Sequence, residues 1–369
     1  MELPQSTDVF VVGGGPAGLA AAIAARRRGL RVTVADHGHP PVDKACGEGI
    51  MPDGLAAARA LGIQLEGKGQ PFRGIRFCHG DERVQADFPQ GPGFGIRRTT
   101  LHRILVEEAE RAGARLLWRT GVTGMDSRRV YLGAAAVEAA WVVGADGGNS
   151  RVRDWAGLAG SRRNSRRYGF RRHYPVAPWS EFMEIHWGED CQLYITPTGP
   201  REICAVVISG DSRLRLDEAL PRFPQVAGRL AGIAPLTPER GAVSATRRLC
   251  GVTRGRVALI GDASGSVDAI TGEGLCLLFQ QALALGDALA AGNLAPYEAK
   301  HRLIRKRPAR MAALMLMLDR RTGLRRRTMR VLAAHPPLFA RMLAMHLKDG
   351  SILPYFANTL SLGWGILTV

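Results

Sequence analysis

The sequence predicts an α/β fold in which a Rossmann-like nucleotide-binding domain is joined to an antiparallel β-sheet domain and a helical C-terminal part. Three observations support this fold. A glycine-rich turn joins a strand to a helix near the N-terminus, two later strands end in an acid beside a glycine, and the segment 168–242 alternates polar and apolar residues. At 369 residues the chain also exceeds the length at which a single core stops growing, about 250–300 residues, so we expect more than one domain.

The first motif lies between an apolar run, 8–12, and an alanine-rich helical segment. Gly13 permits a tight turn, Gly15 lets backbone amides approach a diphosphate, and Gly18 allows close packing of helix on strand. Pro16 and Ala17 open the helix, whose N-terminus offers unpaired N–H groups and partial positive charge. The motif predicts a diphosphate at this turn. A second strand, 31–36, ends at Asp36, about 20 residues after the glycines, where a ribose hydroxyl is expected.

Two later strands end in a comparable way. The strand 140–145 is followed by Asp146 and Gly147, and the strand 255–260 is followed by Gly261 and Asp262. A long helix with apolar residues at helical spacing begins near 275, and the amides of 272–274 at its N-terminus can face a partly negative ligand. Sites so far apart in the sequence predict that the domain encloses an extended ligand.

The loop 44–52 carries two candidate catalytic residues, Cys46 and Glu48. Gly47 and Gly49 flank Glu48, and glycines at such positions favour a close approach to a flat ligand. A surface turn with a buried Cys46 is the alternative, and the sequence leaves both open.

The middle of the chain predicts an antiparallel sheet. The runs 74–78 and 82–88 form a hairpin, and further strands follow at 182–187, 192–196 and 203–208, with a turn at 197–200. Half-polar strands are typical of a sheet with one face covering a pocket. We expect a discontinuous nucleotide-binding domain of 1–71, 95–165 and 243–300, a sheet domain of 72–94 and 166–242, and a helical region of 301–369.

Composition limits the classes of function. Hydrophobic residues make up 46% and charged residues 22%, as in soluble globular proteins, and no signal segment precedes the first strand, so we expect a cytoplasmic protein. The net charge of +17, with basic clusters at 162–167 and 300–330, predicts a solvated basic surface and leaves open a carrier protein or membrane surface as partner. No nucleic-acid-binding motif accompanies these clusters. The six cysteines lie far apart, so we expect neither a disulfide framework nor a metal site.

The three motifs together resemble those of FAD-dependent oxidoreductases of the superfamily that holds para-hydroxybenzoate-hydroxylase-type monooxygenases, geranylgeranyl reductases and flavin-dependent halogenases. The matching residues are Gly13-x-Gly15-x-x-Gly18 with Asp36, Asp146-Gly147 with Ser150 and Arg153, and Gly261-Asp262 with Gly272-Glu273-Gly274. The resemblance implies a Rossmann-like FAD-binding domain of the GR2 type, FAD bound non-covalently, and NAD(P)H as electron donor. It also implies that Asp146 matters for engaging both FAD and the pyridine nucleotide.

The same resemblance implies roles for other residues. Asp36 would hold the adenosine ribose, Arg98 would contact the cofactor from the start of its helix, and the backbone of Val122 would meet the adenine. Asp262 would bond the ribityl chain, and the amides of 272–274 would face the pyrimidine edge of the flavin.

Departures from the hydroxylase pattern are informative. Hydroxylases of this superfamily usually carry a histidine and a proline where Gly265 and Ala269 stand here. The loop Cys46-Gly47-Glu48-Gly49 resembles the Cys-Gly-Gly loop of the reductases, and the Trp-x-Trp-x-Ile-Pro signature of tryptophan halogenases is absent. The strand with Tyr194, Thr196 and Pro197 resembles the substrate sheet of small-molecule monooxygenases, so these three residues are candidate substrate contacts.

We therefore expect an FAD-dependent monooxygenase that hydroxylates or epoxidises a hydrophobic aromatic, polyketide or isoprenoid molecule with NAD(P)H and O2, in secondary metabolism. Two alternatives stay open. One is a reductase of the geranylgeranyl-reductase kind that saturates an alkene, with Cys46 beside the flavin ring. The other is a flavin-binding redox partner without its own turnover.

The segment 300–369 lies outside the resemblance. We expect its helices to cap the sheet domain and line a hydrophobic substrate pocket with Met311, Leu314, Met315, Leu318, Leu332, Phe339, Met342 and Leu343. The uncharged run 351–369 is interrupted by Pro354, Gly363 and Gly365, so we expect no transmembrane anchor there.

Overall fold

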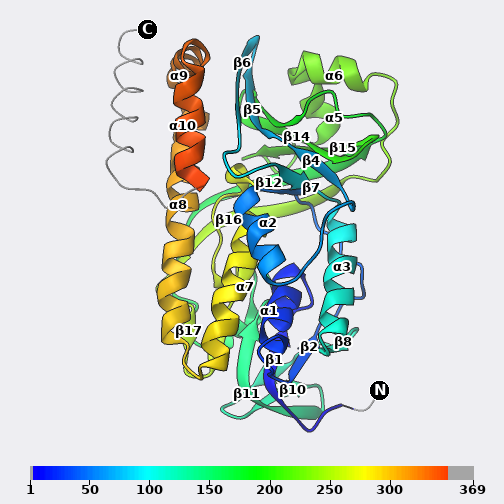
Figure 1. The fold of residues 1–369 in the computed structure, drawn as a ribbon, viewed down its shortest axis with the longest axis vertical. Coiled ribbons are helices and arrows are strands. Elements are labelled where there is room, and N and C mark those ends of the chain that lie inside the picture. The colour runs from blue at the N-terminus through cyan, green and yellow to red at the C-terminus, as the bar shows by residue number, and fades with distance from the viewer. Residues whose placement is uncertain (1–2, 348–369) are drawn as a thin grey trace.

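The computed structural model describes residues 3–347, with only the backbone described over 161–164. It shows an eight-stranded sheet in the lower half of Figure 1, a seven-stranded sheet in the upper half and a small three-stranded sheet between them. Helices flank both large sheets, and the long helix α8 runs beside both halves (Figure 1).

The eight-stranded sheet has a parallel centre. Its strand order is β17-β18-β11-β1-β2-β8, with β10 and β9 attached antiparallel beside β11. The strands are β1 (Ser6–Val12), β2 (Val32–Ala35), β8 (Arg115–Leu117), β9 (Gly124–Met125), β10 (Arg129–Leu132), β11 (Ala135–Gly144), β17 (Thr253–Arg254) and β18 (Val257–Leu259). The strands predicted to precede the three motifs are confirmed as β1, β2, β11 and β18, which run parallel. Their carboxyl ends therefore meet at one edge of the sheet.

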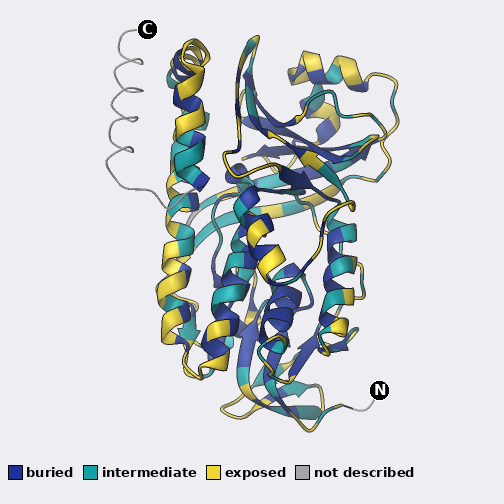
Figure 2. Ribbon diagram, viewed as in Figure 1, coloured by how far each residue is buried: buried dark blue, intermediate teal, exposed yellow. Residues whose placement is uncertain are grey.

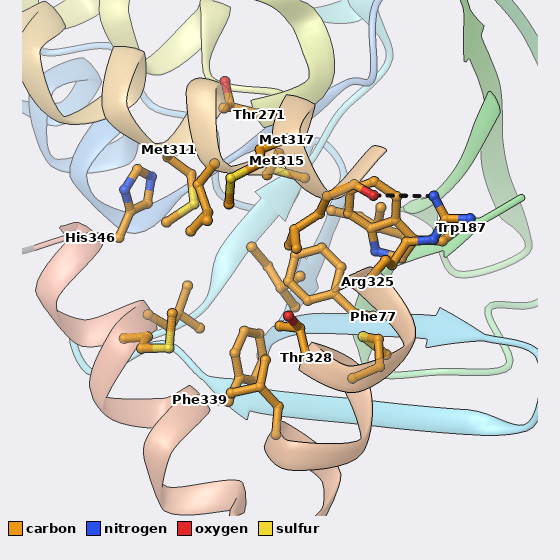
Figure 3. Close-up of a pocket in the computed structure, with 18 of the residues that line it drawn as sticks. Phe77, Trp187, Thr271, Met311, Met315, Met317, Arg325, Thr328, Phe339 and His346 are labelled. Carbon is orange, nitrogen blue, oxygen red and sulfur yellow. Dashed lines mark hydrogen bonds between the residues drawn. The ribbon is translucent and has the colours of Figure 1, made fainter. Parts of the chain in front are cut away.

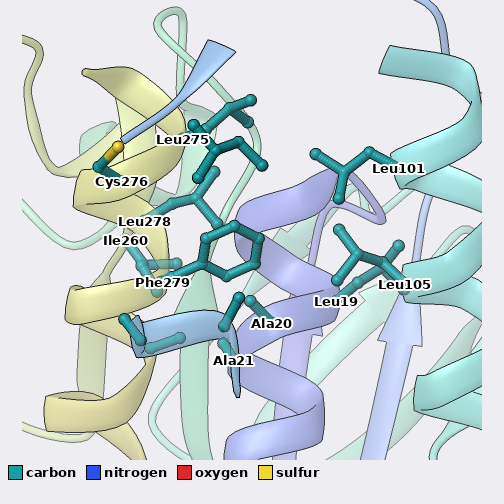
Figure 4. Packing of buried hydrophobic residues seen from close by; sticks show 14 of the residues in the cluster. Leu19, Ala20, Ala21, Leu101, Leu105, Ile260, Leu275, Cys276, Leu278 and Phe279 are labelled. Atoms are coloured by element: carbon teal, nitrogen blue, oxygen red, sulfur yellow. The ribbon is translucent and has the colours of Figure 1, made fainter. Parts of the chain in front are cut away.

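Three helices pack on this sheet: α1 (Pro16–Arg26), α3 (Arg98–Arg111) and α7 (Gly274–Ala290). The alanines of α1 after Ala17 are buried, and their short side chains let α3 and α7 approach closely on either side. Figure 4 shows Phe279 of α7 and Leu105 of α3 directed toward Leu19 and Ala20 of α1. This core fixes the N-termini of α1 and α7 at the same edge of the sheet.

The seven-stranded sheet has the order β16-β12-β15-β14-β13-β5-β6. Its strands are β5 (Gly74–His79), β6 (Glu82–Asp87), β12 (Ser161–Tyr174), β13 (Phe182–Trp187), β14 (Cys191–Gly199), β15 (Glu202–Ser209) and β16 (Arg240–Leu249). Neighbouring strands are antiparallel except β13 and β5, which are parallel. The predicted hairpin is confirmed as β5 and β6, and the three predicted strands as β13, β14 and β15.

Two details of the predicted sheet are wrong. The turn expected at 197–200 lies later, because β14 continues through Gly199, with a register irregularity between Pro197 and Gly199 that accommodates the proline. The central strands are also not half-polar in their burial: every residue of β13 and all but the last of β14 are buried, and the ribbon at β14 is dark blue in Figure 2. Both faces of the sheet are covered, one contributing to the main core and the other to a second core with α5 and α6.

The remaining elements connect the two large sheets. They are the small sheet β3 (Gly49–Ile50), β7 (Gly93–Gly95) and β4 (Gln70–Phe72), the helices α2 (Pro52–Ala60), α4 (Arg151–Trp155), α5 (Leu216–Ala219) and α6 (Pro224–Leu230), and the 3-10 turns η1 (Leu220–Arg222), η2 (Gly261–Ser264) and η3 (Ala269–Thr271). The paired strands β12 and β16 run across the positions 165/166 and 242/243 at which we divided the chain. The division into domains stays a prediction.

The predicted helical C-terminal part is confirmed as α8 (Ala295–Arg320), α9 (Thr322–Ala334) and α10 (Pro336–Leu347). The 26 residues of α8 give it a length of about 39 Å at 1.5 Å per residue. Helix α8 contacts α7 and η3 in the lower half and reaches α9 and α10, which pack on β6 in the upper half. No helix among residues 3–347 is both long and apolar enough to cross a membrane, and the run 351–369 lies outside the described residues.

The basic clusters are only partly a solvated surface, so that prediction needs correction. Arg167 is buried and pairs with Asp319 at 2.7 Å. Arg305 donates to the backbone carbonyl oxygen of Ser264 at 2.9 Å, and Arg325 is 1% exposed. These arginines stabilise contacts between elements, because a guanidinium can bond several carbonyl or carboxylate oxygens at once.

Candidate functional site

The first glycine turn is shaped by contacts that leave no room for side chains. Gly13 has a φ of 109°, and a Cβ atom on Gly18 would lie 1.9 Å from the carbonyl oxygen of Gly13. Gly15, in contrast, has no atom within 4 Å of the position of a Cβ, and no side chain caps the N-terminus of α1. Free amides therefore face open space, which is what a diphosphate requires.

Asp36 supports this turn. One carboxylate oxygen accepts a hydrogen bond from the amide of Gly14 at 2.6 Å, and the other accepts from the amide of Gly38 at 2.7 Å. Buried His102 contacts the carbonyl oxygen of Gly14 through Nε2 at 2.8 Å. Asp36 thus lies beside the glycine turn at the end of β2, where a ribose hydroxyl is expected. Its contact with a ribose stays a prediction, as does the adenine contact of half-buried Val122.

A hydrogen bond connects the second motif to the third. Asp146 accepts hydrogen bonds from the amides of Arg151 and Val152 through Oδ2, while its buried Oδ1 has no hydrogen-bond partner among the described residues. Arg153 donates to the carbonyl oxygens of Gly148, at 3.0 Å, and Ala263, at 3.2 Å. Gly147, with a φ of 83°, lies in the turn between β11 and α4.

The third motif lies against the first. A Cβ on Gly261 would lie 2.7 Å from the Cβ of Ala17, so the two turns touch. The half-exposed carboxylate of Asp262 pairs with Lys44 Nζ at 3.0 Å. Gly272 adopts a left-handed conformation with a φ of 68°, and α7 begins at Gly274 without a capping side chain.

These contacts test whether an extended nucleotide fits. The structure brings together the glycine turn, Asp36, Asp146 and the N-terminus of α7 at the carboxyl edge of one sheet. This edge offers two uncapped helix N-termini and an unsatisfied Asp146 oxygen, and the buried Nε of Arg98 at the start of α3 is also without a partner among the described residues. FAD carries phosphate and hydroxyl groups that match these amides and side chains, so the residues fit the cofactor.

The loop 44–52 places Glu48 in a buried ionic cluster. Glu48 adopts a φ of 59°, and its carboxylate accepts from Arg171 Nη1 at 2.9 Å and from the backbone amide of Arg98 at 2.9 Å, and contacts His173 Nε2 at 2.7 Å. Cys46 Sγ accepts from the Glu48 amide at 3.3 Å, and burial raises the pKa of this thiol, which keeps it protonated. Catalytic roles for Cys46 and Glu48 stay predictions; in the structure Glu48 anchors the loop to the upper sheet.

The same cluster has the side chains of a metal site. Glu48, His173 and Cys204 each place one potential ligand atom within 4.8 Å of the others. Arg171, however, already donates to Glu48, so a cation here would lie beside a guanidinium. The observed hydrogen bonds account for the cluster without a metal.

The three candidate substrate residues contact the loops around the motifs. Tyr194 donates to the carbonyl oxygen of Ile270 at 2.6 Å, and Thr196 donates to that of Gly47 at 2.8 Å. A Cβ on Gly95 would lie 1.7 Å from the carbonyl oxygen of Pro197. None of the three lines the cavity described next, so a substrate contact through them stays a prediction.

A cavity of about 260 Å³ lies between the upper sheet and the three C-terminal helices (Figure 3). All eight residues predicted to line a pocket from this region do so. The opposite wall is formed by the predicted sheet, where β5 and β13 contribute Ile75, Phe77, Ile185 and Trp187, although these four residues were not singled out in advance. These four residues are adjacent in space because β5 pairs with β13. Met51 and Thr271 connect the cavity to the loops of the nucleotide-binding edge.

A pair of titratable side chains lies where the cavity meets the nucleotide-binding edge, and this pair was not predicted. His346 of α10 lines the cavity, and its Nε2 lies 2.9 Å from Glu273 Oε1, with both side chains largely buried. Burial alone would lower the pKa of His346, but the Glu273 carboxylate outweighs it and raises this pKa. The charged form of His346 is therefore favoured. Its partner Glu273 stands between Gly272 and Gly274 at the N-terminus of α7.

Comparisons with known proteins agree with this geometry. Residues 6–306 match the family described as "FAD binding domain". Menaquinone reductase of Mycobacterium tuberculosis is 30% identical over 313 residues, covering 74% of each chain. The 3-hydroxybenzoate 6-hydroxylase of Polaromonas naphthalenivorans is 28% identical over 357 residues, covering 85% of this chain and 86% of the relative.

Solved structures share the fold. A flavoprotein/dehydrogenase from Cytophaga hutchinsonii has a TM-score of 0.83 at 15% identity, covering 98% of both chains. A triple mutant of the flavin-dependent brominase Bmp2 has a TM-score of 0.79 at 17% identity, covering 97% of this chain and 99% of the other. The family match covers most of the chain and includes all three motifs. The chain therefore belongs to the FAD binding domain family and is an FAD-dependent oxidoreductase.

Proposed function

We propose that the protein is a monooxygenase that holds a lipophilic small molecule in the cavity and hydroxylates or epoxidises it with NAD(P)H and O2. The observation that carries this proposal is the apolar cavity between the upper sheet and helices α8–α10, which reaches Thr271 beside the N-terminus of α7. FAD, bound non-covalently at the nucleotide-binding edge, would supply the electron transfer and oxygen activation. An aromatic, polyketide or isoprenoid compound of secondary metabolism is the substrate class that this lining favours.

The residues that line the cavity favour apolar molecules of irregular outline. Six methionines line the cavity, among them Met311, Met315 and Met342. Methionine is flexible and polarisable, so it adapts to molecules of irregular outline. A lining of this kind also excludes water, which protects a reactive centre and strengthens nearby electrostatic interactions.

The N-terminus of α7 would hold the reacting end of the cofactor. Its first-turn amides, after Gly272, are uncapped and carry the positive end of the helix dipole. They can stabilise negative charge on a flavin ring. Asp262 and Lys44 lie at the same edge and would contact the cofactor's sugar and phosphate groups.

The His346–Glu273 pair can hold a proton at this end of the cavity. His346 Nε2 lies 2.9 Å from Glu273 Oε1, so a proton held on this nitrogen would be donated to that carboxylate. Because His346 also lines the cavity, it can orient an oxygen of the substrate or exchange a proton with it.

The same pair favours a second candidate function, the saturation of an alkene. Such a reduction adds a hydride to one carbon and a proton to the other, and a protonated imidazole in the cavity could supply the proton. The similarity to menaquinone reductase also supports this candidate. A cytoplasmic location remains part of the proposal. A carrier-protein or membrane-surface partner also remains part of it, and the net charge of +17 supports an anionic partner of this kind.

The test is turnover by the full-length FAD-loaded protein with lipophilic aromatic, polyketide and isoprenoid compounds. The monooxygenase proposal expects substrate-dependent NADH or NADPH oxidation, O2 consumption, and a product that gains one oxygen atom. A product that gains two hydrogen atoms without O2 would instead establish the reductase. FAD-loaded protein that oxidises neither nucleotide with any compound would contradict both and favour a redox partner.

A matched pair of variants connects turnover to the cavity. Leu314→Trp fills the cavity from α8, whereas Leu303 lies on the same helix and is 62% exposed. We expect Leu314→Trp to raise KM or abolish turnover and Leu303→Trp to leave both unchanged. Equal effects of the two variants would place the substrate elsewhere.

A further inference from the structure

The cavity contains two polar groups that the protein itself does not satisfy. Arg325 and Thr328 lie one helical turn apart on α9, and both line the cavity on the side opposite His346 (Figure 3). Arg325 is 1% exposed and Thr328 is 5% exposed. Arg325 Nε and Thr328 Oγ1 are buried, and neither has a hydrogen-bond partner among the described residues.

The positive charge of Arg325 meets only neutral acceptors. Its Nη atoms donate to the backbone carbonyl oxygens of Leu318, at 3.3 Å, Asp319, at 3.1 Å, and Gly188, at 3.1 Å. The guanidinium lies 5.6 Å from the centre of the Trp187 ring. The carboxylate of Asp319 is occupied elsewhere, by Arg167 and Gln192. Within the described part of the chain, no carboxylate forms an ion pair with Arg325.

Such an arrangement is costly without a ligand. A buried cation is strongly disfavoured unless it is paired, and a buried hydroxyl without a hydrogen-bond partner is also destabilising. Burial also lowers the pKa of Arg325, which shows that the surroundings disfavour its charge. An anionic group with two acceptor oxygens, such as a carboxylate, would satisfy the guanidinium and the hydroxyl together, through charge-assisted hydrogen bonds.

We propose that the substrate is a lipophilic acid whose anionic group, such as a carboxylate, accepts hydrogen bonds from Arg325 Nε and Thr328 Oγ1. The apolar body of the molecule fills the methionine-lined part of the cavity, and its reacting part lies toward Thr271 and His346. The opposite end is not suited to the anion, because the charge of His346 is already paired with Glu273. This proposal rests on the proposed function in one respect, that the cavity is the substrate site.

The experiment measures equilibrium binding to the FAD-loaded full-length protein, without NAD(P)H. The probes are dodecanoate and its methyl ester, which share the chain but differ in the charge of the oxygen, and binding is followed by calorimetry. We expect dodecanoate to bind at least about tenfold more tightly than the ester, since a charged acceptor strengthens both hydrogen bonds relative to the neutral ester oxygen and the two together contribute this much. Equal affinities for the two probes would overturn the proposal.

Two variants locate the preference. Thr328→Val keeps the shape of the side chain and removes a hydroxyl without a partner, so it should fold with an unchanged or higher Tm. Thr328→Val and Arg325→Met should both reduce the preference for dodecanoate to less than about threefold while leaving the ester affinity unchanged. Thr271→Val is the matched control, because Thr271 lines the same cavity but its hydroxyl already donates to the carbonyl oxygen of Asp268. This control should retain the full preference.

The outcomes separate this proposal from the proposed function. An acid preference that persists in Thr328→Val would overturn the proposal, and this variant decides the matter if Arg325→Met does not fold. An acid preference located at Arg325 and Thr328, in a protein without turnover, would uphold the binding site and refute the monooxygenase. Turnover of neutral compounds only, with equal binding of dodecanoate and its ester, would uphold the monooxygenase and refute the anion-binding site.

Discussion

The two glycines Gly15 and Gly18 should respond to the same substitution in opposite ways. In Gly18→Ala the new Cβ would lie 1.9 Å from the carbonyl oxygen of Gly13, against an ordinary carbon–oxygen contact of about 3.3 Å. Helix α1 would have to move by about 1.4 Å away from the strand to relieve this contact. Overpacking typically costs about 1–3 kcal/mol, and we expect a value near 3 kcal/mol because the atom approached is backbone.

In Gly15→Ala the fold has no reason to change. Gly15 has a φ of −70° and a ψ of 174°, which alanine adopts freely, and no atom lies within 4 Å of the new Cβ. The free energy of unfolding should therefore stay within about 0.5 kcal/mol of the parent. The added methyl group would instead occupy the space in front of the free amides of α1. We expect the Kd for FAD to rise at least about tenfold, or about 1.4 kcal/mol.

The assay separates stability from binding. Thermal unfolding is measured on both variants and the parent after removal of FAD, because bound cofactor would itself raise the Tm. At about 2–4 °C per kcal/mol, Gly18→Ala should lower the Tm of the apoprotein by about 6–12 °C, whereas Gly15→Ala should not change it. FAD affinity is then measured by fluorescence titration. A Gly15→Ala protein with the parental Kd would refute the placement of the diphosphate at this turn.

Three further predictions concern other parts of the site. Asp262→Ala should yield largely FAD-free protein that is still folded, because Asp262 is half-exposed and pairs only with Lys44 among the described side chains; a fully yellow variant with parental affinity would exclude the side chain as an anchor. Glu48→Ala should lower the free energy of unfolding by about 1–3 kcal/mol, since Arg171 Nη1 and His173 Nε2 lose their buried acceptor while Asp43 still pairs with Arg171; chemical denaturation monitored by circular dichroism would measure this loss, and a parental midpoint would contradict it. The raised pKa of His346 contributes stability that is fully present below the ordinary imidazole pKa of about 6.5 and is lost as the pH rises through the raised value. The Tm of the parent should therefore fall over this alkaline range, whereas the Tm of His346→Gln should not, and parallel pH profiles of the two proteins would refute the His346–Glu273 ion pair.

The nucleotide-binding edge could be predicted from the sequence because its signals are local. A strand, a glycine turn and a helix follow one another within about 20 residues, and each glycine has a reason in the backbone path nearby. The parallel order of β1, β2, β11 and β18 then brings three such segments to the same edge. The C-terminal lining was also predictable, since apolar residues at helical spacing in α8–α10 had to face a common partner.

The polar parts of the site could not be predicted in this way. Glu48 meets Arg171 and His173, which lie more than a hundred residues later on β12, and only the register of the upper sheet brings them together. Arg325 belongs to a run of arginines, and nothing in that run marks it as the one buried against Trp187. The predicted half-polar sheet was wrong because α5 and α6 cover one face and the C-terminal helices, far along the chain, cover part of the other.

The residues that line the cavity are distributed unevenly along the sequence. Of the twenty lining residues within 3–347, fourteen follow residue 306, where the family match ends, and six precede it. With the cavity as the proposed substrate site, cofactor binding and most substrate contacts would be encoded in separate stretches that natural selection can alter independently. Mutation or recombination confined to the last helices could redirect the enzyme to new molecules without disturbing the flavin machinery. Relatives that share the first 306 residues closely should be expected to differ most in what they act on, and chimaeras joined near this point are a direct route to new specificities.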